Sequence, residues 1–294
     1  MTMQCATKDD VELTGVPLYE IRTEVMSASA RICVVGGDAG MAEDARARLL
    51  ELAGRWDGAA ADSEIGRINT GSGAPVPASP ETVLLVGLAL QAARETRGGY
   101  DPRALPRLLD GVGGFRREDS TTTWIERFVV DPRSGTVGIP PCAALDLGGI
   151  DRGLAADLVV ADALDAGAYG VCVDVGGHVR AAGAAPCRNG WVLAVEHPLA
   201  PLPVASLRLR GGAVGTSART AYAAGRASAQ ETPGLVAVTV VGASAWHAKA
   251  IARAALRAGY RHGQALVERA GGAALFCFTD GTCRPTTGWW AFAD

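Results

Sequence analysis

The chain has 294 residues, 48% of them hydrophobic, and its 28 basic side chains nearly balance 31 acidic ones, which gives a formal charge of −3. This balance excludes a protein that binds nucleic acid or an anionic membrane through a broad basic surface. The length and the apolar fraction predict a folded protein with a substantial core and exclude a chain that is disordered throughout.

The polar start of the chain predicts a flexible leader over residues 1–17, followed by a single folded domain over residues 18–294. No apolar run reaches the roughly 20 residues that a transmembrane helix needs, and the first residues lack a signal-peptide pattern. We therefore expect a cytoplasmic protein. The seven cysteines include no Cys-x-x-Cys pair, so neither a disulfide framework nor a zinc site is indicated. Cys33, Cys172 and Cys277 lie in apolar runs and are expected to be buried.

Apolar periodicity predicts a strand at residues 31–36 and helices at residues 38–52 and 80–97. Between the helices, Ser63 is expected to cap the segment ADSEIGRIN at residues 61–69. Further along, strands are expected at residues 127–130, 145–150, 171–175, 191–198, 205–217, 235–242 and 273–282, and helices at residues 152–165 and 244–258. Short turns between consecutive strands favour an α+β fold with a mainly antiparallel sheet and inserted helices.

Several common catalytic motifs are missing. The sequence has no HExxH, no GxSxG and no GxxxxGK[ST], so nothing supports a zinc hydrolase, a serine hydrolase or a P-loop protein. His197 precedes a proline after a strand and His262 follows the end of a helix. Both histidines are interpreted as solvated turn residues.

Four segments in fixed order carry a more specific signal. They are ADSEIGRIN at 61–69, GGYDP at 98–102, LDLGGIDRGLAAD at 145–157 with the VDVGGHVRAAG that follows, and AVGTSA at 213–218. The ordered set resembles the ApbE family of FAD:protein FMN transferases over about residues 20–285. The resemblance implies an α+β fold of two closely packed lobes around a flavin cleft. It also implies binding of FAD, with magnesium, and transfer of FMN to a Thr or Ser of an acceptor protein.

The matched positions give a set of expected FAD-binding residues: Met26, Gly99, Tyr100, Asp101, Asp146, Gly149, Arg152, Thr216 and Ser217. Glycines after Asp146 allow a phosphate or metal to approach the backbone, and the helix that follows offers free N–H groups. Arg152 stands where relatives carry a lysine and keeps the positive charge. The alternatives are a helix cap for Asp146, a core methionine for Met26 and an ordinary turn at Thr216 and Ser217.

The sequence departs from the family pattern at three places. Ala59 replaces an aromatic residue, and residues 225–234 lack a His-x-x-Asp-Pro stretch. In the segment AKAIARA at residues 248–254, Lys249 and Arg253 replace the Asp and Thr that bind magnesium in relatives. Neither a lysine nor an arginine can ligate Mg²⁺, which needs oxygen donors. The sequence therefore predicts no metal site in the family's usual form.

Lys249 and Arg253 are i, i+4 neighbours on one helix face, where two like charges repel unless an anion lies between them. We expect them to neutralise the pyrophosphate of a nucleotide ligand directly, the alternative being a solvated helix face. His178 follows a Gly-Gly turn and is a candidate for acid–base chemistry, with a plain turn residue as the alternative. Three functions remain open: an FMN transferase, a non-catalytic protein that binds FAD or another anion, and an enzyme of another reaction class that uses Lys249 and Arg253 in a small-molecule pathway.

Overall fold

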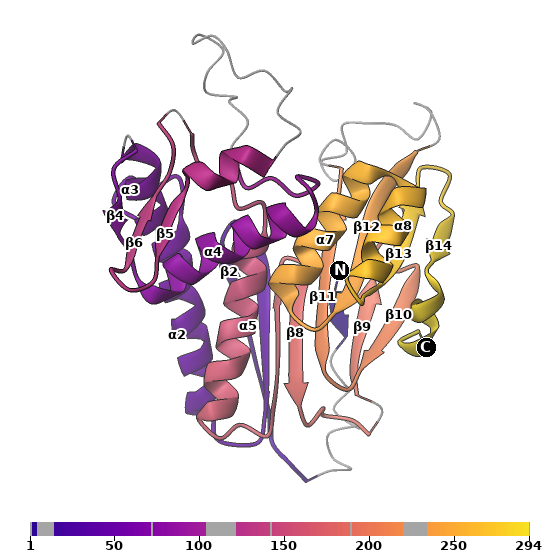
Figure 1. Cartoon of the computed structure of the whole chain (residues 1–294). Coiled ribbons are helices and arrows are strands. Elements are labelled where there is room, and N and C mark those ends of the chain that lie inside the picture. Colours follow the sequence, from indigo (N-terminus) through magenta and orange to yellow (C-terminus); the bar gives the residue numbers. More distant parts are fainter. Residues whose placement is uncertain are drawn as a thin grey trace. The chain divides into compact units, whose positions relative to one another are not determined.

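The computed structural model describes residues 2–4, 15–71, 73–103, 122–141, 143–188, 190–219 and 234–293. Most of the expected leader, and nearly all of residues 225–234, lie outside the described residues. The chain divides into two compact units (Figure 1), of which unit 1 is Met1–Leu50 with Arg152–Asp294 and unit 2 is Glu51–Asp151.

Unit 1 is built on an eight-stranded sheet in the order β14-β13-β12-β11-β8-β7-β3-β2. The strands are β2 (Leu18–Val25), β3 (Ala28–Val35), β7 (Gly170–Val175), β8 (His178–Gly183), β11 (Gly212–Ala218), β12 (Leu235–Gly242), β13 (Ala273–Phe278) and β14 (Cys283–Pro285). Each strand pairs with its neighbours in antiparallel fashion. This confirms the expected α+β fold with a mainly antiparallel sheet.

One face of this sheet packs against a second sheet of three strands. Its strands are β1 (Thr2–Gln4), β9 (Trp191–Val195) and β10 (Ala205–Leu209), in the order β1-β9-β10. Val214 and Val241 of the large sheet and Trp191 and Leu207 of the small one belong to a single buried cluster. Trp289 of the 3₁₀ helix η2 (Thr287–Ala291) joins the same cluster. The core of unit 1 therefore lies between the two sheets.

Two helices near the C-terminal end cover part of the large sheet (Figure 1). Helix α7 (Ala245–Ala258) packs on β11 and β12, and α8 (Tyr260–Arg269) packs on α7 and β13. Successive side chains of a strand point to opposite faces, so Gly215, next to the core residue Val214, lies on the face that α7 covers. Helix α7 and the small sheet therefore lie on opposite faces of the large sheet.

Unit 2 contains the remaining elements. They are α3 (Glu64–Thr70), α4 (Pro80–Glu95), the 3₁₀ helix η1 (Thr122–Arg127), and a small sheet of β4 (Val76–Pro77), β6 (Thr136–Gly138) and β5 (Val129–Asp131). Helices α2 (Ala39–Trp56) and α5 (Ile150–Asp165) each begin in one unit and end in the other. Ser63 caps α3 as expected, because its Oγ accepts the Gly66 N–H at 2.9 Å.

Several expectations need correction. Strands β1, inside the expected flexible leader, and β2, and helix α8, were not expected. The strand expected at residues 205–217 is in fact two strands, β10 and β11, which belong to different sheets. Residues 145–150 form no strand but a single bridge, between Leu145 and Arg103, before a turn. His197 is not solvated, since only 3% of it is exposed. By contrast, Cys33, Cys172 and Cys277 are buried as expected. In the described part of the chain, every helix is too short or too polar to cross a membrane.

Candidate functional site

Helix α7 packs against the backbone of a glycine at two positions. A Cβ at Gly215 of β11 would lie 2.5 Å from the carbonyl carbon of Ala248 and closer still to the nitrogen of Lys249. A Cβ at Gly153 of α5 would lie 2.6 Å from the nitrogen of Trp246. Side chains do not reach such distances, so only glycine permits the contacts. The two glycines thus fix where the backbone of Lys249 lies.

The first turn of α7 is held by a carboxylate from another helix. Asp157 of α5 accepts the N–H of Ala245 with both oxygens at 2.9 Å, and Oδ2 also accepts the N–H of Trp246 at 3.1 Å. Ser244, the residue before α7, makes no capping hydrogen bond with its side chain. Burial raises the pKa of Asp157 to about 6, although the hydrogen bonds from Ala245 and Trp246 act in the opposite direction. Asp157 therefore anchors α7 over the sheet.

Lys249 points to β11, which supplies a backbone acceptor. Its Nζ donates to the carbonyl oxygen of Thr216 at 2.8 Å. The hydroxyl of Thr216 is engaged elsewhere, 3.0 Å from the hydroxyl of Thr239 on β12, and by strand alternation it shares a face with Val214 rather than with α7. Ser217 lies on the α7 face and is buried. The backbone of the expected Thr-Ser pair, rather than the threonine hydroxyl, thus meets the ammonium.

His178 opens β8 directly opposite Gly215 and is buried. Its pKa lies well below the usual 6.5 because burial disfavours the imidazolium, and because the charges of Lys249 and Arg152 repel it. The ring is therefore neutral at pH 7. Its buried Nδ1 has no hydrogen-bond partner among the described residues. The site holds two cations beside an uncharged imidazole.

Two hairpin turns lie near Arg152, one between β2 and β3 and one between β7 and β8. Its Nη2 donates to the carbonyl of Met26 at 2.6 Å. Met26 and Ser27 connect β2 to β3 with positive φ angles of 51° and 56°. The N–H of Gly176, in the turn before His178, donates to the carbonyl of Ser29 at 2.9 Å, so the two turns lie next to each other.

Five predicted site residues of unit 1 therefore form one group, which we call the cationic cluster: Met26, Arg152, His178, Thr216 and Lys249. Arg253 follows one turn later on α7 and is half-buried. Sequence reasoning missed Asp157, Gly153 and Gly215, which position this group. All three lie in motifs already quoted, but a motif does not show what its residues contact.

Three of the matched motifs also converge within unit 2. Asn69 pairs with the backbone of Leu145, accepting its N–H at 2.7 Å and donating to its carbonyl at 3.4 Å. The hydroxyl of Tyr100 donates to the carbonyl of Leu147 at 2.8 Å. The N–H of Asp146 donates to the carbonyl of Pro102 at 2.7 Å. The segments 61–69, 98–102 and 145–149 thus form a second group, bound together mainly through backbone.

The predicted residues of this second group differ in what they can offer a ligand. Asp101 forms an ion pair with Arg103 at 2.7 Å, and Tyr100 is fully buried. Asp146 is exposed and accepts the N–H of Gly148 at 3.1 Å. Gly149 has a φ of 93°, a conformation that residues with a Cβ rarely adopt. Gly99 donates its N–H to the carbonyl of Thr96.

The side chains on α7 do not fit a magnesium ion. Mg²⁺ takes oxygen ligands in octahedral geometry, whereas α7 presents an ammonium and a guanidinium at positions 249 and 253. The backbone oxygen of Thr216 on β11 already accepts a hydrogen bond from Lys249. Among the described residues, the His, Cys, Asp and Glu side chains close enough together to hold a metal are His197, Cys277 and Cys283, and none of them belongs to the cationic cluster.

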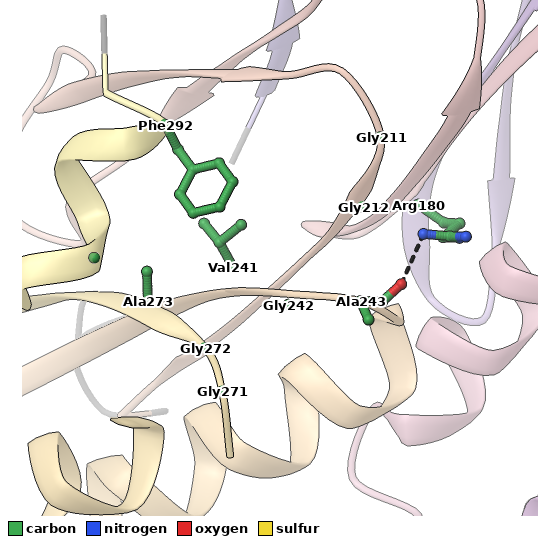
Figure 2. Close-up of a pocket in the computed structure, with 11 residues that line it drawn as sticks. Arg180, Gly211, Gly212, Val241, Gly242, Ala243, Gly271, Gly272, Ala273 and Phe292 are labelled. Atoms are coloured by element: carbon green, nitrogen blue, oxygen red, sulfur yellow. Dashed lines mark hydrogen bonds between the residues drawn. The ribbon is translucent and has the colours of Figure 1, made fainter. Parts of the chain in front are cut away.

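A cavity of about 520 Å³ lies elsewhere in unit 1 (Figure 2). It is bordered by glycines at the ends of β11 and β12, by Phe292, and by Arg180, whose Nη1 donates to the carbonyl of Ala243 at 2.7 Å. No residue predicted from the sequence as a site residue lines this cavity. We therefore place the candidate site at the cationic cluster.

The fold is that of solved flavin transferases. An ApbE protein from Thermotoga maritima superposes with a TM-score of 0.78 at 22% identity, covering 95% of this chain and all of its own. The flavinyl transferase ApbE of Pseudomonas stutzeri gives a TM-score of 0.74 at 20% identity, covering 95% of this chain and 98% of its own. Flavin transferase ApbE of Vibrio cholerae gives a TM-score of 0.73 at 19% identity, covering 94% of this chain and 99% of its own.

The sequence profile of the ApbE family matches residues 19–276. The chain therefore belongs to the ApbE family and is a homologue of its FAD:protein FMN transferases. A comparison with curated protein sequences gave no match.

Proposed function

We propose that this protein binds FAD and neutralises its pyrophosphate with Lys249 and Arg152, in place of the magnesium ion that flavin transferases of the family use. The observation that carries the proposal is the position of Lys249, whose Nζ lies 2.8 Å from the carbonyl oxygen of Thr216, an expected FAD-binding residue. We further propose that the protein does not catalyse magnesium-dependent FMN transfer.

The charges of the cationic cluster support an anionic ligand. Lys249 and Arg152 carry two positive charges, and both act on the buried His178. The pyrophosphate of FAD carries two negative charges at neutral pH, so its binding would offset this repulsion. The guanidinium of an arginine can donate two parallel hydrogen bonds to two phosphate oxygens, whereas the ammonium of a lysine acts as a point charge. The two cations can therefore replace the charge of a divalent metal.

Replacing the charge of a metal does not replace its catalytic action. In FMN transfer, a Thr or Ser oxygen of the acceptor forms a bond to the FMN phosphorus while the bond to AMP breaks. A metal ion stabilises the charge that develops in such a step by several kcal/mol and orients the phosphate oxygens. An ammonium and a guanidinium do not hold these oxygens in an octahedral arrangement as the ion does, and on this ground we propose binding without transfer.

Binding of FAD in the presence and absence of EDTA tests the proposal. We expect the dissociation constant to be unaffected by EDTA and to rise by roughly 10- to 100-fold in Lys249→Ala, since a hydrogen bond to a charged group contributes about 1.5 to 3 kcal/mol. Arg261→Ala is the matched control, because this exposed arginine lies on the neighbouring helix α8. Equal affinity in Lys249→Ala and the control would refute the role of Lys249.

A second assay distinguishes binding from transfer. Incubation with FAD, Mg²⁺ and a peptide acceptor that contains threonine is expected to release no AMP and to leave no flavin on the acceptor. Release of AMP that stops on addition of EDTA would show that the family's metal-dependent transfer persists, and with it an acceptor protein as partner. Tight binding of FAD without AMP release is the result that we expect.

An enzyme of another reaction class, with Lys249 as nucleophile, has less support. A nucleophilic amine must lose its proton and turn its lone pair to the substrate. In the structure, Nζ of Lys249 is a hydrogen-bond donor to a backbone carbonyl, as expected of a structural or ligand-binding ammonium.

A further inference from the structure

Two cysteines near the C-terminal end of unit 1 lie opposite each other on adjacent strands. Cys277 on β13 and Cys283 on β14 are partners in the antiparallel register, and their sulfur atoms are 3.0 Å apart. The pair lies outside the cationic cluster, and nothing in the proposed binding of FAD uses it.

The local register favours a covalent bond between the two side chains. The N–H of Phe278 donates to the carbonyl of Thr282 at 2.9 Å, so these two residues form a hydrogen-bonded pair. The pair before it, Cys277 with Cys283, is then a non-hydrogen-bonded pair, whose Cα atoms lie about 4.5 Å apart in antiparallel sheets. That separation falls within the range of about 4.4 to 6.8 Å that disulfides span.

The turn between the two cysteines is held by hydrogen bonds of its own. Asp280 accepts both the N–H and the hydroxyl of Thr282, at 2.9 and 2.7 Å. Gly281 donates its N–H to the carbonyl of Phe278 at 3.0 Å. The two sulfur atoms are therefore kept together by the backbone, and closing a bond between them needs no rearrangement of the hairpin.

The two thiols differ in environment. Cys277 is buried in the core cluster, and its hydrogen bond with Cys283, together with burial, raises its pKa. Cys283 is partly exposed, and its pKa is lowered because the thiol of Cys277 can donate a hydrogen bond to its thiolate. Since the thiolate is the reactive form, Cys283 is the thiol that reacts first with a molecule from solution.

A nearby histidine raises the alternative of a metal site, because the ligand atoms of His197, Cys277 and Cys283 all lie within 4.8 Å of one another. Both ring nitrogens of His197 are already engaged. Nε2 lies 3.0 Å from the carbonyl oxygen of Phe278, to which it donates, and Nδ1 accepts the N–H of Leu199 at 3.0 Å. A metal would have to displace one of these bonds, whereas a disulfide displaces neither.

We propose that Cys277 and Cys283 form a reversible disulfide by exchange with a small-molecule disulfide. The thiolate of Cys283 attacks one sulfur of that molecule, which releases one small thiol and leaves a mixed disulfide on Cys283. The thiol of Cys277 then loses its proton and displaces the second small thiol. Two protein thiols and one small disulfide thereby give one protein disulfide and two small thiols.

Mass spectrometry of the full chain tests this directly. After incubation with oxidised glutathione, free thiols are alkylated in denaturant and the chain is digested with trypsin. The sequence from Ala270 onward contains only Arg284 as a basic residue, and Pro285 after it blocks cleavage, so one peptide carries both cysteines. We expect this peptide to lose two hydrogen atoms and both alkylation sites, and to regain them on reduction.

Variants define the order of the two steps. Cys277→Ala is expected to trap glutathione on Cys283, whereas Cys283→Ser is expected to leave Cys277 unmodified. Cys187→Ser, a control at another partly exposed cysteine, should still form the bond. Persistent alkylation of both thiols in the oxidised wild-type chain would refute the proposal. So would one equivalent of Zn²⁺ that protects both thiols and is lost in His197→Gln, because this result assigns the group to a metal.

Discussion

A neutral histidine beside two cations is the most informative single residue of the cationic cluster. His178 is buried, and Lys249 and Arg152 both disfavour its protonation. A neutral imidazole in this position cannot serve as an additional cation for a phosphate. Its pKa, however, responds to a phosphate that binds nearby. A bound anion offsets the positive charges and thus makes protonation less unfavourable.

We therefore predict that the pKa of His178 rises when inorganic pyrophosphate or FAD binds. Nitrogen chemical shifts of the imidazole, followed as a function of pH, measure this pKa with and without the ligand. In the free protein the ring should stay neutral at a pH where an exposed histidine is largely protonated. His262, an exposed histidine on α8, is the internal control. An unchanged titration of His178 at saturating ligand would place the anion elsewhere.

At this scale the sequence predicted the members of the cationic cluster but not their contacts. The resemblance placed Met26, Arg152, His178, Thr216 and Lys249 at a site, and the structure brings them together. It could not indicate that Lys249 would bind a backbone carbonyl, or that the hydroxyl of Thr216 would pair with Thr239. Such contacts depend on the face of the strand to which each side chain points. Thr216 and Ser217 are consecutive residues of β11, so their side chains point to opposite faces of the sheet.

Among the elements, α7 determines where the cationic site lies. Its first turn is anchored by Asp157, and its backbone rests on Gly215 and Gly153. Glycines allow the helix to approach both β11 and α5 at backbone distance, and a methyl group at either position would collide with main-chain atoms that cannot move independently.

We predict that Gly215→Ala lowers the free energy of unfolding by roughly 3 kcal/mol or more and weakens FAD binding, because α7 must move away from β11. Gly54→Ala is the control. Gly54 lies inside α2, and a methyl group added there would meet no atom within 4 Å, so its replacement should stabilise the helix by about 0.5 to 1 kcal/mol. Urea denaturation compares the two variants. A Gly215→Ala protein as stable as the wild type would show that α7 is free to shift.

Elements with strong periodicity were predictable, and the exceptions have physical reasons. Helix α4 begins at the expected residue, and α7 begins one residue after the expected start. Helix α8 was missed because Gly259 ends α7 and Gly263 interrupts the next segment, whereas in the structure Gly263 allows α8 to pack against the backbone of Ala255. Residues 145–150 were expected as a strand, but their backbone bonds instead to Asn69 and Pro102, more than 40 residues earlier in the chain.

For the molecule as a whole, a buried carboxyl makes stability depend on pH. Burial raises the pKa of Asp174 from 3.8 to about 6, although the hydrogen bond from Gly177 lowers it. Between pH 3.8 and about pH 6 the folded state keeps a proton on Asp174 that the unfolded state has released. The contribution of this group to the free energy of unfolding therefore falls as pH rises through this window and is largest below it.

We predict that the stability advantage of the wild type over Asp174→Asn is greater at pH 4 than at pH 7, by roughly 2 to 3 kcal/mol at about 1.4 kcal/mol per pKa unit. Chemical denaturation at both pH values measures it. Asp280→Asn is the control, because the hydrogen bonds from Thr282 lower the pKa of Asp280 and its contribution does not fall as pH rises. A pH-independent difference for Asp174→Asn would mean that this carboxyl is solvated in the folded protein.

The overall fold was predictable to a greater degree than the function, since the ordered motifs indicate the family and its fold, whereas Lys249 and Arg253 fall outside the pattern that the resemblance supplies. The resemblance gave an antiparallel α+β fold, and the structure and the family profile confirm it. The sequence could not settle which ligand the altered positions accept, because that depends on distances between charged groups.

The close contacts of α7 have one more consequence. Glycine backbone and the Asp157 carboxylate hold this helix, and these contacts do not involve the side chains at 249 and 253. The position of α7 is therefore set by contacts other than the side chains at 249 and 253, so replacing these two side chains is expected to change what the site binds while the core keeps its packing.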